Sequence, residues 1–359
     1  MQVAIIGAGL AGLSCAIVLE KNGIIPVVYE KTNFIGDREA HVGASLKIVD
    51  RPVKDITKYL KKSFDIDVKP LNTITKLTHY APAATTSISG SFGLFFRRDK
   101  EETSLKGQLF SQLQKTEIQF NMDVDYKVIS KEFDYVVLAD GKPDMSEKLG
   151  CWTDWVRGII KGAVLEGNFD PQELIMWLNK TYCKAGYAYL TPFSDRRASI
   201  SLYVPDISID EIDYYWDLFL KDLHFKYEIV ETFKVRHGSG HVYPHKVDNI
   251  LLAGSVGGAI DPFLGFGIVK SITMGGLAAK SIIEGSDYEK LVKNIYKQSL
   301  RLYEIRESFN MASNENYDTM VKLIGIPGVK PMLYDVPINV LKLGNVGLKL
   351  KRKIKGERL

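Results

Sequence analysis

The 359-residue sequence predicts an α/β protein: a doubly wound, Rossmann-like domain, an inserted and mostly antiparallel β domain, and a helical carboxyl-terminal region. Two observations predict the doubly wound domain. A glycine-rich turn joins a strand to a helix near the amino terminus, and a second glycine-rich segment at 254–267 does the same far downstream. A third observation, a series of strand-like runs between 151 and 241, predicts the inserted β domain.

Composition sets the broad class. The chain is 45% hydrophobic and 25% charged, which is typical of a globular protein with a sizeable core. Its formal net charge of +4 is too small to indicate a nucleic-acid partner. The three cysteines, Cys15, Cys151 and Cys183, are far apart in the sequence, which fits neither a disulfide framework nor a metal site. We therefore expect a cytoplasmic protein without a metal.

The amino-terminal turn has the full context of a dinucleotide-binding motif. An apolar strand at 2–6 leads into Gly7-Ala8-Gly9-Leu10-Ala11-Gly12, then a helix to about 22 and a second strand at 26–29 that ends in Glu30. The first glycine permits the tight turn, the second lets the backbone approach a pyrophosphate, and the third allows helix and strand to pack closely. Glu30 is expected to bind ribose hydroxyls. A glycine-rich turn without a nucleotide is the alternative.

The downstream segment indicates which nucleotide is bound. A strand at 249–253 runs into Gly254-Ser255-Val256-Gly257-Gly258-Ala259-Ile260-Asp261-Pro262-Phe263-Leu264-Gly265-Phe266-Gly267-Ile268, followed by a helix to about 283. It resembles the G-D-x-x-G-x-x-x-P-x-x-G-x-G-I segment of flavoproteins related to para-hydroxybenzoate hydroxylase and the geranylgeranyl reductases. The resemblance implies FAD, with the helix start at the flavin's pyrimidine edge, where it stabilises negative charge. Ser255 replaces the family's ribityl-binding Asp and is a weaker, uncharged partner.

Two further stretches are similar to this family, and a third departs from it. Arg98 matches an arginine that reaches the flavin phosphates, although a solvated arginine at a strand end is an equal alternative. Tyr187 and Tyr189 stand in a stretch resembling Y-x-W-x-F-P, which implies an aromatic wall for an isoprenoid; an ordinary core pair is the alternative, and flavin halogenases have a related stretch. In the third stretch, archaeal members carry a cysteine near the position of His41, and this sequence has none there. His41 is either a proton donor or a structural histidine.

Together these motifs define the candidate site residues. The candidates near the reacting centre are Tyr187, Tyr189, Asp261, Pro262 and His41. The residues expected to contact FAD are Gly7, Ala8, Gly9, Leu10, Ala11, Gly12, Glu30, Lys31, Ala44, Arg98, Gly254, Ser255, Gly265, Gly267 and Ile268.

The motifs also divide the chain into expected domains. The FAD-binding domain is expected at 1–73, 98–150 and 242–285, the substrate domain at 74–97 and 151–241, and a helical region with a basic tail at 286–359. From Lys342 onward the tail has seven basic residues and one acidic residue, interleaved with apolar ones. Such a tail favours peripheral contact with an anionic membrane, and a solvated tail is the equal alternative.

The family resemblance implies an FAD-dependent oxidoreductase that reduces carbon–carbon double bonds in a prenyl or geranylgeranyl lipid. Two alternatives stay open: an FAD-dependent monooxygenase or halogenase acting on an aromatic or apolar substrate, and a non-catalytic flavin- or lipid-binding protein. The partners expected are a small-molecule or lipid substrate and an electron donor. Because the sequence has no second G-x-G-x-x-G motif, that donor is left open between ferredoxin, a reduced flavin and NAD(P)H.

Overall fold

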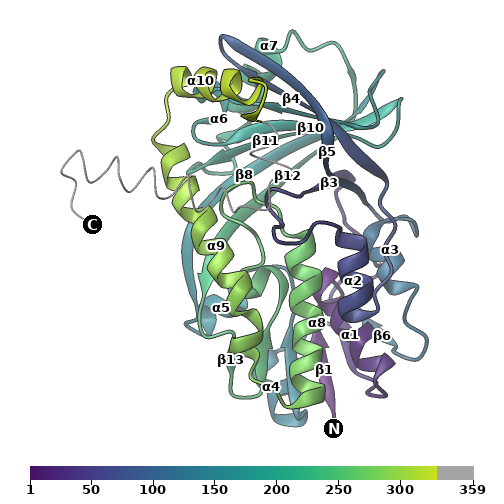
Figure 1. The fold of residues 1–359 in the computed structure, drawn as a ribbon. Coiled ribbons are helices and arrows are strands. Elements are labelled where there is room, and N and C mark those ends of the chain that lie inside the picture. The colour runs from purple at the N-terminus through teal and green to yellow at the C-terminus, as the bar shows by residue number, and fades with distance from the viewer. Residues whose placement is uncertain (330–359) are drawn as a thin grey trace, which may run out of the picture.

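The computed structural model describes residues 1–329, which form two β-sheets flanked by helices (Figure 1). The basic tail that was expected to contact a membrane lies outside the described residues. The first sheet is six-stranded. In spatial order its strands are β13 (Lys246–Val247), β14 (Ile250–Leu252), β7 (Tyr135–Leu138), β1 (Val3–Ile6), β2 (Val27–Glu30) and β6 (Ile118–Phe120). All its neighbours are parallel except β13 and β14, so the carboxyl ends of β1, β7 and β14 meet at one edge.

The second sheet is eight-stranded and antiparallel except between β4 and β9. Its order is β12 (Glu228–Val242), β8 (Trp152–Glu166), β11 (Arg197–Pro205), β10 (Tyr187–Pro192), β9 (Glu173–Trp177), β4 (Asn72–Ala81), β5 (Ala84–Arg98) and β3 (His41–Leu46). The sequence ranges expected for the substrate domain supply all of these strands except β3. That strand lies inside 1–73 but pairs with β5, so it forms an edge of the eight-stranded sheet.

Ten α-helices and one 3₁₀ helix complete the part of the chain between residues 1 and 329. They are α1 (Leu10–Lys21), α2 (Ile56–Phe64), α3 (Leu105–Phe110), α4 (Tyr126–Glu132), α5 (Asp144–Lys148), α6 (Lys180–Cys183), α7 (Ile212–Asp222), η1 (Gly254–Gly257), α8 (Ile268–Glu284), α9 (Tyr288–Asn310) and α10 (Asn314–Ile324). None of them is both long and apolar enough to cross a membrane.

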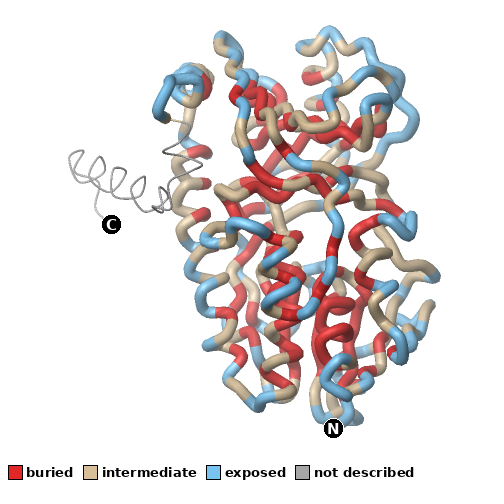
Figure 2. The backbone as a smooth tube through the Cα atoms, turned by 45° about the vertical axis from the view of Figure 1, so that its right-hand side comes forward, coloured by how far each residue is buried: buried red, intermediate tan, exposed pale blue. Residues whose placement is uncertain are grey.

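The six-stranded sheet is covered on both faces, as a doubly wound domain requires. Ile5 and Val137 belong to the apolar cluster that contains α1 and α8, whereas Ala4 and Val136 belong to the cluster of α4 and α5. Successive residues of a strand point to opposite faces, so continuous apolar strands are expected here. The buried positions follow these strands and the helix faces turned toward them (Figure 2). The predicted fold class is confirmed.

Two local expectations differ from the structure. The helical region expected from residue 286 onward is divided into two helices, because α9 ends at Asn310 and Ser313 caps α10 with a reciprocal hydrogen-bond pair. The strand β9 was missed because its short run, Glu173–Trp177, follows a turn and shows no clear alternation. It matters because β9 joins the strands of 74–97 to those of 151–241 in one sheet.

Candidate cofactor and substrate site

The amino-terminal glycine turn is shaped by close backbone contacts. Gly7 has φ of 103°, and a Cβ at this position would lie 2.5 Å from the carbonyl oxygen of Ala139. A Cβ on Gly12 would lie 1.9 Å from the Gly7 oxygen. No side chain caps the amino end of α1, whose N-cap is Gly9. The first amide groups of this helix therefore point out of the turn without a side-chain partner.

Glu30 lies at the end of β2, directly beside this turn. One carboxylate oxygen accepts a hydrogen bond from the Ala8 amide at 2.9 Å, and the other accepts from the amide and hydroxyl of Thr32, each at 2.9 Å. A carboxylate offers about four lone-pair positions, so at least one is left for a ligand hydroxyl. Lys31, by contrast, is exposed.

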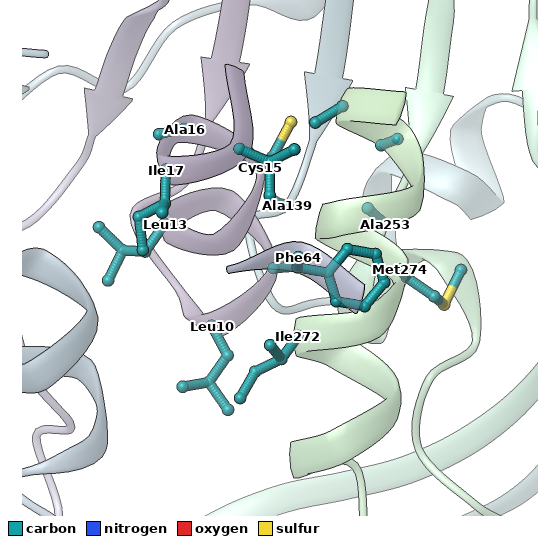
Figure 3. Packing of buried hydrophobic residues seen from close by; sticks show 14 of the residues in the cluster. Leu10, Leu13, Cys15, Ala16, Ile17, Phe64, Ala139, Ala253, Ile272 and Met274 are labelled. Carbon is teal, nitrogen blue, oxygen red and sulfur yellow. The ribbon is translucent and has the colours of Figure 1, made fainter. Parts of the chain in front are cut away.

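The second glycine segment packs directly on the first. A Cβ on Gly254 would lie 2.9 Å from the Cβ of Ala11, and one on Gly275 would lie 2.1 Å from the Ala11 oxygen. Helices α1 and α8 therefore run side by side, with Leu10 close to Ile272 between them (Figure 3). Gly267 is the N-cap of α8, and no side chain caps that helix either. Two segments more than 200 residues apart thus present two open helix amino ends to one region.

These elements surround a cavity of about 400 Å³ between the two sheets. The structure brings many of the predicted residues to its wall: Leu10, Ala11, His41, Ala44, Arg98, Tyr187, Tyr189, Gly254, Ser255, Gly265, Gly267 and Ile268. Eight predicted residues are not among the described residues that line it: Gly7, Ala8, Gly9, Gly12, Glu30, Lys31, Asp261 and Pro262. Gly7 and Gly9 form the turn that precedes Leu10, Gly12 lies in the first turn of α1, and Glu30 ends β2 beside them.

Asp261 organises the loop that precedes α8. It is fully buried, and its carboxylate accepts hydrogen bonds from the amides of Phe263 at 2.9 Å, Leu264 at 2.8 Å and Phe266 at 2.6 Å. Burial raises the pKa of Asp261, and these amide contacts oppose the rise. Its observed contacts thus hold the Gly265–Gly267 backbone in place. Pro262, the next residue, is buried as well.

Arg98 lines the cavity as part of a charged group that sequence reasoning did not find. Its Nη2 donates to Asp37 Oδ1 at 2.9 Å, and Lys106 Nζ lies 2.9 Å from the same oxygen. Burial would raise the pKa of Asp37, but the charges of Arg98 and Lys106 hold it well below its usual range. Asp37 follows Gly36, whose φ of 138° lies in a region that favours glycine. Gly36 was therefore the available sequence signal for this turn.

An aromatic and histidine wall faces the glycine segments across the cavity. The rings of Tyr187 and Tyr189 lie 5.9 Å apart on β10, and the Tyr187 hydroxyl donates to the Leu264 carbonyl. Burial raises the pKa of both tyrosines, so they stay protonated. Burial also lowers the pKa of His41, and that of His237 to about 4, so both rings are neutral at pH 7. His237 was missed, because a lone histidine on β12 carries no motif.

Comparison with known proteins identifies the class of fold. A sequence model described as an NAD(P)-binding Rossmann-like domain matches residues 5–44. A geranylgeranyl bacteriochlorophyll reductase-like protein from Thermoplasma acidophilum superimposes with a TM-score of 0.71 at 17% identity, over 96% of this chain and 98% of that one. A flavin-dependent brominase gives 0.67 at 16% identity, over 98% and 100% of the chains.

A flavoprotein/dehydrogenase from Cytophaga hutchinsonii superimposes with a TM-score of 0.63 at 12% identity, over 96% of this chain and 100% of that one. These likenesses extend over nearly the whole chain, but at such identities they establish the fold alone. The chain shares its fold with these reductase-like, brominase and flavoprotein structures, in agreement with the fold class that the two glycine segments predict. Reductases and halogenases share this fold, so it leaves the reaction undetermined.

Proposed function

We propose that the chain binds FAD along this cavity and reduces carbon–carbon double bonds of a prenyl lipid. The observation that carries the proposal is the meeting of two helix amino ends, neither capped by a side chain, at one cavity with an aromatic opposite wall. Helix amino ends favour anionic groups, which FAD has at its pyrophosphate and, when reduced, at its pyrimidine edge.

Residues in the cavity wall and in the adjoining glycine turn suit the successive parts of FAD. The α1 amides and the Gly9 turn suit the pyrophosphate, and the free lone pair of Glu30 suits the adenosine ribose. Ser255 lines the cavity beside Gly254 and offers a hydroxyl to the ribityl chain. The amino end of α8 suits the pyrimidine edge. Arg98 already binds Asp37, so any contact with phosphate uses its remaining N–H groups.

Reduced FAD would supply hydride, whereas the protein would orient the substrate, exclude water and provide protons. The apolar faces of Tyr187, Tyr189, Phe233 and Ile160 line the same cavity and suit a hydrocarbon chain. The same wall contains groups that carry a proton: the two tyrosine hydroxyls and the N–H groups of the neutral histidines His41 and His237. Asp261 is engaged by three backbone amides, which supports a structural role for it in this scheme.

The test begins with the purified protein's visible spectrum, which should show oxidised-flavin bands near about 370 and 450 nm. The FAD-loaded protein is then reduced anaerobically with dithionite and mixed with geranylgeraniol. Mass spectrometry should show products that have gained two hydrogens for each reduced double bond. Ferredoxin, reduced FMN and NAD(P)H are then compared as donors. Reduced flavin without any saturated product would contradict the proposed reaction.

Oxygen chemistry is the second candidate, supported by the similarity of the fold to a flavin-dependent brominase. Stopped-flow mixing of the reduced protein with oxygen distinguishes the two. Rapid return to oxidised flavin agrees with a reductase, whereas a long-lived absorbance of a flavin–oxygen adduct favours a monooxygenase or halogenase. A protein whose bound flavin no donor reduces, dithionite included, would be a binding protein rather than an enzyme.

A further inference from the structure

An arginine on α9 is buried without a partner. Arg306 is 1% exposed, and none of its three side-chain nitrogens, Nε, Nη1 and Nη2, has a hydrogen-bond partner within the described residues. A guanidinium group stays protonated and carries five N–H donors. The interior therefore contains a full positive charge with all of its donors unused, which is an unfavourable arrangement unless an anion completes it.

Arg306 has no ion-pair partner within residues 1–329. The ring of Tyr203 lies 6.0 Å from its guanidinium carbon, near the outer limit for a cation–π contact. Burial raises the pKa of Tyr203, Tyr317 and Cys183, and the charge of Arg306 only partly offsets this, so these groups remain neutral.

Two aromatic rings, Tyr203 and then Tyr187, connect Arg306 to the cavity. The rings of Tyr203 and Tyr187 are 5.8 Å apart, and Tyr187 itself lines the cavity. Tyr187 and Tyr203 also belong to one apolar cluster with Leu302 and Phe309, which flank Arg306 on α9. Helix α9 runs beside the larger sheet toward α10 (Figure 1). The hydrogen bond from the Tyr187 hydroxyl to Leu264 fixes the separating ring at its tip.

We propose that Arg306 binds the terminal anion, a carboxylate or a phosphate, of a substrate whose apolar chain lies in the cavity. The inference rests on the proposed function only in placing the substrate at this cavity. An apolar chain with one charged end matches both halves of the site: aromatic rings receive the chain, and the unused N–H fork receives two oxygen atoms of the anion. Entry of that end requires Tyr187 to turn away from Leu264 and the neighbouring Tyr203 ring to move with it.

The experiment measures binding to the full-length, FAD-loaded, oxidised protein, so that no turnover is needed. Isothermal titration compares geranylgeranyl phosphate, geranylgeranoic acid and geranylgeraniol. A second set, dodecyl phosphate, dodecanoic acid and dodecanol, tests the anion preference without a prenyl chain. We expect the unmodified protein to bind anions at least about tenfold more tightly than the matching alcohol. The stronger of the two anions identifies the natural end group.

Variants assign that preference to Arg306. In Arg306→Met the anion advantage should disappear while alcohol binding is kept, and in Arg306→Lys part of the advantage should remain. Arg301→Met, a change at a part-exposed arginine of the same helix, is the matched control and should leave all affinities unchanged. Without ligand, Arg306→Met should melt no lower than the unmodified protein, and anions should no longer raise its melting temperature.

Several outcomes would overturn the inference: equal binding of anions and alcohols by the unmodified protein, an anion preference that survives in Arg306→Met, or an equal loss in Arg301→Met. Should Arg306→Met fail to fold, the unmodified protein and Arg306→Lys decide the question. The alkyl set separates this test from the proposed reaction, because an anion preference with dodecyl ligands stands even if no prenyl double bond is reduced.

Discussion

Two glycine-to-alanine changes at the start of α1 should affect different properties. Gly12→Ala should lower stability, and Gly9→Ala should lower FAD affinity. In Gly12→Ala the new methyl would lie 1.9 Å from the Gly7 oxygen and 3.2 Å from Cγ2 of Ile5, so helix and strand must separate by about 1 Å or more. We expect a loss of about 3 kcal/mol, which exceeds the gain of about 1 kcal/mol in helix propensity. In Gly9→Ala the methyl meets only the Ala139 oxygen at 3.5 Å, an ordinary contact, at a φ of −81°.

The assay is thermal unfolding without cofactor, followed by FAD titration. Gly12→Ala should melt at least about 5 °C lower, whereas Gly9→Ala should melt within about 2 °C of the unmodified protein. FAD affinity of Gly9→Ala should nevertheless fall by at least about tenfold, because its methyl stands where the backbone approaches the pyrophosphate. Normal FAD binding by Gly9→Ala, or an equal loss of stability in the two variants, would refute this prediction.

Three further predictions concern other groups of the site and the sheet. Asp261→Asn should lower the free energy of unfolding in urea by about 1–3 kcal/mol and weaken FAD retention, because at least one of three amide groups loses its acceptor. Unchanged FAD retention would show that this loop does not help to hold the cofactor. Asp37→Asn leaves Arg98 and Lys106 without their shared carboxylate, so it should lower the free energy of unfolding by about 1–3 kcal/mol. The same change should strengthen sulfate binding to the protein without FAD, and weaker sulfate binding would contradict the prediction. His79 is 7% exposed, and burial lowers its pKa to about 4, below the unfolded value of about 6.5. The free energy of unfolding should therefore fall by up to about 3 kcal/mol as the pH drops through that window. His79→Phe should flatten this pH dependence in urea unfolding measured between pH 4 and pH 7, and an unchanged slope would count against the prediction.

The local parts of the site could be predicted because their requirements are local. A glycine that must adopt φ of 103°, as Gly7 does, leaves a mark in the sequence, and so does the change of period from strand to helix at Leu10. The alternation along β10 likewise places Tyr187 and Tyr189 on one face from their spacing alone. These features depend on residues within a few positions of one another.

The groups that sequence reasoning missed depend on partners far along the chain. Arg98 meets Asp37 from 61 residues away, and His237 reaches Gly265 from a different strand. Arg306 has an ordinary helical setting in the sequence, and only packing against the larger sheet makes it a buried charge. Asp261 stands in the predicted motif, yet its three amide contacts exist only once the loop is folded.

The sequence by itself determined the class of fold, the two glycine turns and the FAD they imply, since backbone sterics and hydrophobic period are written residue by residue. Tertiary structure decided which of those residues line one cavity, which charges are paired and which buried arginine of the described chain is left without a counter-ion. Burial and distance are properties of the assembled chain, and no local pattern contains them. They keep His41, His79 and His237 neutral at pH 7 and set the cost of each buried charge.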